Sequence, residues 1–153
     1  MGCRAACGHH LQLSRLQLLD GLPALQRQRS LTVFAEGWGL YAEQLAEEAG
    51  LYSDERGLLG SIGTSLMRSV RLVVDTGLHA LGWSRERALE FAVTHVPMPP
   101  EFMTAEIDRY VVNPGQALAY LTGKLEILRL REEARKRLGP ALSLIHISEP
   151  TRP

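Results

Sequence analysis

Histidine near the start of the chain and glutamate in a later apolar segment are the side chains most suited to bind a metal. His9 and His10 follow Gly8, and Glu36 and Glu43 lie seven residues apart among aromatic residues. Seven residues span about two helical turns, so both carboxylates would share one helix face. Imidazole and carboxylate are ligands of catalytic zinc sites, so one of these carboxylates could bind zinc with His9 or His10. The other interpretation is an amphipathic helix with both carboxylates in solvent.

A second group of polar residues lies in the later half of the chain. His79 follows an apolar run, and Arg109 stands between Asp108 and Tyr110. His79 has the setting of a core histidine, and Asp108 with Arg109 has that of a local ion pair. Residue type alone leaves a functional role open for each.

The elements that would position these residues are helices. Apolar residues recur at steps of three and four along most of the chain. The pattern predicts helices at 31–49, 58–81, 84–93, from Thr104 onward, and at 116–138 with Pro114 leading into it. Ser30, Ser84 and Thr104 are suitable N-caps, whereas Gly50 and Gly82 are suitable stops. No segment has the alternation of a strand, so the predicted fold class is all-α.

Charge and hydropathy exclude several classes of partner. Seventeen Lys and Arg balance seventeen Asp and Glu, so the net charge is zero. A neutral chain is not drawn to nucleic acid or to an anionic membrane. No apolar run is long enough to span a bilayer. Localisation and oligomeric state stay open.

The two ends of the sequence differ from the rest in residue type and in periodicity. Residues 1–7 have neither a cap nor a period, and residues 142–152 are β-branched and follow a helix stop at Gly139. The latter stretch resembles an in-frame translation of sequencing-adapter DNA. The expected organisation is a non-native start at 1–7, a helical domain at 8–141 and an adapter-derived tail at 142–153.

Four sequence blocks in order resemble the C-terminal part of a bacterial family, domain-of-unknown-function family 885. The blocks lie at 8–12, 36–43, 73–84 and 106–120, and they read GHHLQ, EGWGLYAE, VVDTGLHALGWS, and EIDRY followed by PGQALAY. The resemblance implies a helical fold of the gluzincin type, which is that of a class of zinc metallopeptidases.

The family motif resembles His-Glu-x-x-Pro-Gly-His-His, and only its end matches here. Residues 8–10 match Gly-His-His, whereas Cys3, Arg4 and Cys7 stand where histidine, glutamate and proline are expected. The resemblance makes that histidine a zinc ligand and that glutamate the general base. Arg4 can serve as neither.

The resemblance also implies roles for the later residues. Glu36 matches the downstream glutamate that would complete the zinc ligands, and Glu43 would orient a ligand imidazole. His79, Arg109 and Tyr110 match positions that would bind substrate or stabilise an oxyanion.

The function that follows is a zinc-dependent peptidase or amide hydrolase acting on a peptide or small amide. This chain is expected to bind zinc weakly and to be inactive alone, because it lacks the His-Glu half of the motif. The alternative is a noncatalytic α-helical binding module.

Overall fold

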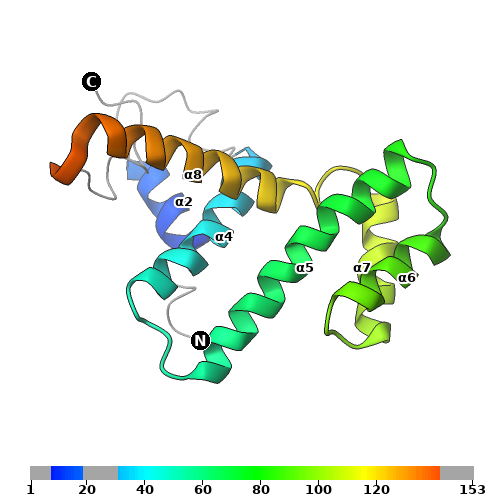
Figure 1. The fold of residues 1–153 in the computed structure, drawn as a ribbon. Helices are drawn as coiled ribbons and strands as arrows, with labels where there is room; N and C mark the ends of the chain where they lie inside the picture. Colours follow the sequence, from blue (N-terminus) through cyan, green and yellow to red (C-terminus); the bar gives the residue numbers. More distant parts are fainter. Residues whose placement is uncertain (1–7, 19–30, 142–153) are drawn as a thin grey trace.

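Helices make up all the regular structure in the part of the chain that the computed structural model describes, residues 8–18 and 31–141. The elements in order are α2 (His9–Leu18), α4 (Thr32–Glu48), α5 (Glu55–Ala80), α6 (Arg85–His95), α7 (Pro100–Val112), α8 (Ala119–Leu138) and the short 3₁₀ helix η1 (Gly139–Ala141) (Figure 1). The predicted all-α class is therefore confirmed. Ser30 and the predicted non-native ends at 1–7 and 142–153 lie outside the described residues.

Several predicted helix ends are confirmed by their local geometry. The Ser84 hydroxyl accepts a hydrogen bond from the backbone N–H three residues later, as an N-cap does. Gly50 and Gly82 follow helix ends with φ of +65°, a conformation that favours glycine. Helix α5 begins earlier than predicted because Asp54 caps it, accepting a 2.8 Å bond from the backbone N–H of Gly57.

Two predicted starts were wrong. Helix α7 begins at Pro100, and the Thr104 hydroxyl donates back to the Pro100 carbonyl within the helix instead of capping it. Proline is favoured at the first helical position because a backbone N–H at that position has no acceptor within the helix, and proline carries no N–H. Helix α8 begins at Ala119, after a turn whose Gly115 N–H is bound 3.1 Å from a carboxylate oxygen of Asp75.

The helices form two groups, joined by the long α5 (Figure 1). One core lies where α6 and α7 pack against the C-terminal half of α5. Its fully buried residues include Val74, Ala88, Ala92 and Ile107. The other core lies between α4 and α8 and contains Trp38, Tyr41 and Ile127.

The second core depends on two glycines. A Cβ on Gly123 would lie 1.9 Å from the Val33 carbonyl oxygen, and one on Gly37 would lie 2.5 Å from the Gly123 backbone. The backbones of α4 and α8 therefore touch, which places the Glu36 end of α4 beside the start of α8.

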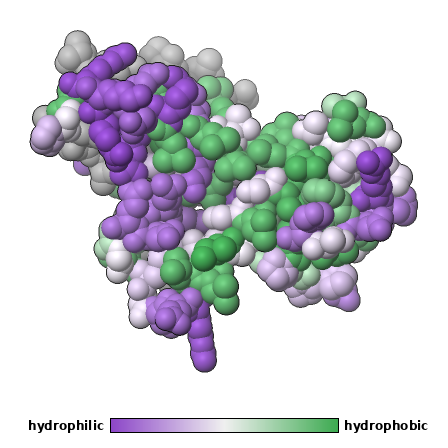
Figure 2. Space-filling model, viewed as in Figure 1, coloured by the Kyte–Doolittle hydropathy of each residue, from purple (hydrophilic) through white to green (hydrophobic). Residues whose placement is uncertain are grey.

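The surface differs between the two ends of the molecule. Figure 2 shows hydrophilic residues over the C-terminal part of α8 and apolar patches along α5. The exposed apolar side chains of α5 include Leu59, Ile62, Leu66 and Val73. Within residues 8–18 and 31–141, no helix has both the length and the hydropathy needed to cross a membrane.

Candidate functional site

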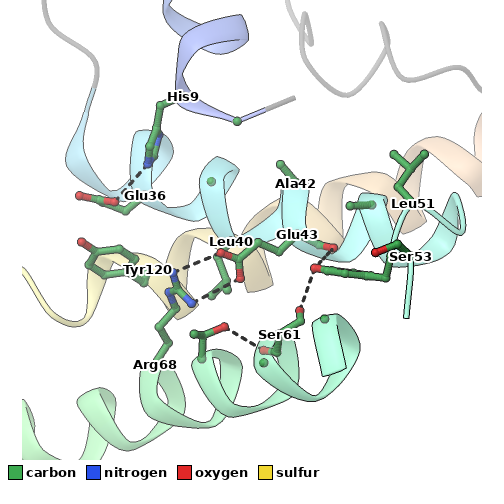
Figure 3. A pocket seen from close by; sticks show the side chains of 17 residues that line it. His9, Glu36, Leu40, Ala42, Glu43, Leu51, Ser53, Ser61, Arg68 and Tyr120 are labelled. Atoms are coloured by element: carbon green, nitrogen blue, oxygen red, sulfur yellow. Dashed lines mark hydrogen bonds and ion pairs between the residues drawn. The ribbon is translucent and has the colours of Figure 1, made fainter. Parts of the chain in front are cut away.

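A cavity of about 690 Å³ lies between α4 and the N-terminal half of α5, with the start of α2 at one end (Figure 3). On the α5 side its wall includes four small residues, Gly57, Gly60, Ser61 and Thr64. These residues recur at three- and four-residue steps and so share one helix face. Their small side chains leave the space open, and a Cβ added at Gly60 would meet nothing within 4 Å.

His9 and Glu36 meet at the α2 end of this cavity (Figure 3). The Nε2 atom of His9 lies 3.6 Å from Oε2 of Glu36, and their side chains are 51% and 22% exposed. The His9 ring lies over Gly39, where a Cβ would come within 2.7 Å of the ring. His10 is exposed and does not line the cavity. Of the two histidines, the structure brings His9 to Glu36.

The separation of these two side chains suits a shared metal. Two ligands that each lie about 2.1 Å from a tetrahedral zinc ion are roughly 3.4 Å apart. In the described part of the chain, no group of three or more His, Cys, Asp or Glu could hold a metal ion. His9 and Glu36 therefore offer two side chains of ligand type, one fewer than the three that a catalytic zinc site takes from the protein.

Glu43 lies further along the cavity and pairs with Arg68 of α5 (Figure 3). The two guanidinium nitrogens Nη1 and Nη2 of Arg68 each donate to one carboxylate oxygen at 3.3 Å. Glu43 is only 9% exposed. The predicted shared face is confirmed, since Glu36 and Glu43 both line the cavity, but Arg68 was not singled out from the sequence.

Tyr110 and Arg109 lie in a different polar cluster, centred on Glu106. The Tyr110 hydroxyl donates to Glu106 at 2.7 Å and accepts from Nε of Arg71, also at 2.7 Å. Arg71 and Arg109 each bind the same carboxylate oxygen of Glu106, at 2.6 and 2.9 Å. Tyr110 is 1% exposed, and none of these four residues lines the cavity.

The charge states in this cluster follow from its contacts. Burial alone would raise the pKa of Glu106, but hydrogen bonds from Arg109 and Tyr110 and the charge of Arg71 outweigh it and hold the pKa at about 2. Burial raises the pKa of Tyr110, and its bond to the Glu106 carboxylate raises it further. Glu106 is therefore ionised and Tyr110 neutral at physiological pH.

His79 belongs to a set of contacts that joins α5 to the end of α7. Its Nε2 lies 3.0 Å from the Tyr110 carbonyl oxygen. One turn earlier, Asp75 is 2% exposed and binds the turn before α8. A Cβ on Gly77 would lie 2.5 Å from the Trp83 ring. Much of the block at 73–84 thus serves packing, and His79 does not line the cavity.

Arg71 was not singled out from the sequence, although its place within an apolar run was a signal. It follows Val70 and precedes the apolar run Leu72–Val74. An arginine within a buried helix face needs a partner, because an unpaired buried charge is costly. The partner, Glu106, lies 35 residues away and could not be identified from local spacing.

The helices and the paired cavity residues define an all-α protein with a cavity bordered by a histidine–glutamate pair. The chain belongs to the family described as "Bacterial protein of unknown function (DUF885)", whose model matches residues 5–145. It is also similar to the crystal structure of "the putative lipoprotein from Colwellia psychrerythraea", with 43% identity and a TM-score of 0.87. That match covers 93% of this chain, which spans 24% of the other protein's length. No curated protein matches.

Proposed function

We propose that this chain supplies two zinc ligands, His9 and Glu36, and part of the substrate cavity of a zinc-dependent amide hydrolase. The observation that carries the proposal is the 3.6 Å approach of His9 Nε2 to Glu36 Oε2 at the end of the cavity. A zinc ion held there would lower the pKa of a bound water and polarise the scissile carbonyl.

The cavity supports a peptide or small amide as the substrate. Its volume lies in the range of small-molecule sites, which is about 300–1,000 Å³. The small residues of the α5 wall would let an extended backbone lie close to the helix. The Glu43–Arg68 ion pair lies beside them and would form a polar border of the substrate cavity.

The remaining ligand and the general base would come from the His-Glu half of the family motif. In this sequence Cys3 and Arg4 occupy those positions. The chain as it stands is therefore expected to bind zinc weakly and to hydrolyse nothing by itself.

The test is a calorimetric zinc titration of the chain with Cys3→Ser and Cys7→Ser, which remove competing thiolates. We expect weak one-to-one binding that is lost with His9→Ala and with Glu36→Ala. The matched controls His10→Ala and His95→Ala, which remove histidines outside the cavity, should leave the affinity unchanged.

Zinc binding that survives both His9→Ala and Glu36→Ala would overturn the proposed site. Nanomolar affinity abolished by Glu36→Ala would keep the site but contradict a two-ligand chain. Absence of binding would favour the noncatalytic binding module, for which Arg4 in place of the base is the supporting observation.

A further inference from the structure

The two oxygens of the Glu36 carboxylate have different neighbours. Oε2 faces His9, whereas Oε1 lies 3.4 Å from Nε2 of Gln116, which donates to it. Gln116 comes from the turn between α7 and α8, eighty residues further along the chain. One oxygen of Glu36 is therefore occupied by a neutral donor, and the other is turned toward the imidazole.

The orientation of the Gln116 amide is fixed by Arg109. The Gln116 Oε1 atom accepts a 2.8 Å hydrogen bond from Nη1 of Arg109. A guanidinium only donates, so the amide oxygen must face Arg109 and the amide NH₂ must face Glu36. In the contact between them, the Gln116 amide is therefore the donor and the Glu36 carboxylate is the acceptor.

Arg109 is fixed in turn by a second set of donors on the same guanidinium. Its Nε and Nη2 bind the two oxygens of Glu106 at 3.3 and 2.9 Å, which leaves Nη1 for Gln116. Asp75 holds the backbone of the turn through the N–H of Gly115, the residue before Gln116. Both the side chain and the backbone of Gln116 are therefore held.

We infer that Glu106, Arg109 and Gln116 form a hydrogen-bonded relay that positions the Glu36 carboxylate for metal binding. The inference rests on the proposed role of Glu36 as a zinc ligand. Arg109 and Gln116 are positioning residues in this relay.

An amide between the arginine and the ligand has a physical advantage. An arginine bound directly to Glu36 would neutralise the carboxylate and compete with the metal cation. The neutral amide of Gln116 instead donates one hydrogen bond, restricts rotation of the carboxylate and leaves its charge for the cation. Outer partners of metal ligands typically change metal affinity by about 10–100-fold when they are removed.

The first experiment needs no metal. In the ¹⁵N-labelled chain, the side-chain amide resonances of Gln116 should shift with Glu36→Gln and with Arg109→Gln. The amide of Gln44, which binds Glu48 on the exposed side of α4, is the matched control and should not move. Gln116 resonances that shift with neither substitution would overturn the relay.

The second experiment measures zinc affinity. Gln116→Ala and Arg109→Gln should each weaken binding by about tenfold. Arg109→Lys should not restore it, because one ammonium cannot reach both Glu106 and Gln116 in the guanidinium geometry. Gln44→Ala and Arg85→Gln, which disturb exposed contacts elsewhere, should leave affinity unchanged.

The two proposals fail in different ways. If zinc binding does not depend on Glu36, the proposed function fails, and the positioning role fails with it. If binding depends on Glu36 but is the same in Gln116→Ala and Arg109→Gln, only the relay is wrong.

Discussion

Glu106 and Glu36 are two partly buried carboxylates with opposite surroundings. Their side chains are similarly exposed, 16% and 22%, so burial does not separate them. Glu106 receives three contacts between 2.6 and 2.9 Å, from Arg71, Tyr110 and Arg109. The contacts of Glu36 are longer, 3.4 Å to Gln116 and 3.6 Å to His9.

This difference separates a cluster that stabilises the fold from a carboxylate that lines the cavity. A carboxylate whose acceptor sites are filled by charged donors is a strong structural pair with little capacity left. Glu36 keeps an oxygen directed at an imidazole beside a cavity. The Glu106 cluster accordingly explains the packing of α5 on α7, and Glu36 is the carboxylate that the proposed function assigns to a metal.

The largest expected effect concerns completing the Glu36 site. In a protein that also carries the upstream domain, Cys3→His, Arg4→Glu and Cys7→Pro would add a ligand and a base. Help from a general base is worth about 10²–10⁴-fold in rate, so hydrolysis of a peptide library should become measurable. Glu36→Gln in this repaired protein should remove both zinc and activity.

Tight zinc binding without hydrolysis of any amide or ester in the repaired protein would defeat the hydrolase assignment. It would leave the binding module as the better account. Tyr110→Phe in the same protein separates two roles for that hydroxyl. Lower turnover at unchanged stability would indicate an oxyanion donor, whereas lost stability is expected from its buried contacts.

The next effect breaks the Glu106 cluster. Glu106→Gln removes the charge that pairs with Arg71 and Arg109, and we expect the free energy of unfolding to fall by about 3 kcal/mol. The control is Asp108→Asn, which removes an exposed partner of Arg85 and should cost under about 1 kcal/mol. Urea unfolding of both variants measures the contrast, and equal losses would contradict it.

The pH dependence of stability should also show the contribution of the ionised Glu106 carboxylate. The pKa of Glu106 is lowered to about 2 in the folded chain from 4.5, so its contribution is present above pH 4.5 and is lost as pH falls toward 2. Thermal melts of the wild type should therefore lose stability across this window more steeply than melts of Glu106→Gln. Parallel curves for the two proteins would contradict the ionised cluster.

The fold was largely predictable because its signals are local. The three- and four-residue spacing located the helices, and Ser84, Gly50 and Gly82 marked their ends correctly. Thr104 misled because a threonine within a helix can bind the carbonyl one turn back as readily as it can cap.

The site was predictable only in its residue types. Histidine and glutamate are residue types that suggest a metal pair, which stays a prediction, and the shared face of Glu36 and Glu43 followed from the helical period. The partners of Glu43 and Glu106 could not be predicted from the sequence, because Arg68 and Arg71 lie 25 and 35 residues away from them along the chain. Such pairs are set by the tertiary packing of the helices. The same packing buries the Tyr110 side chain in the core.

Under the proposed function, His9 and Glu36 share a metal and the histidines outside the cavity do not bind it. The most direct measurement follows the ¹³C-labelled histidine ring resonances during a zinc titration of the chain with Cys3→Ser and Cys7→Ser. If His9 and Glu36 share a metal, the His9 resonances shift to saturation, those of His79 and His95 stay in place, and Glu36→Gln abolishes the His9 shift. Equal shifts of all three histidines, or a His9 shift that survives Glu36→Gln, would contradict it.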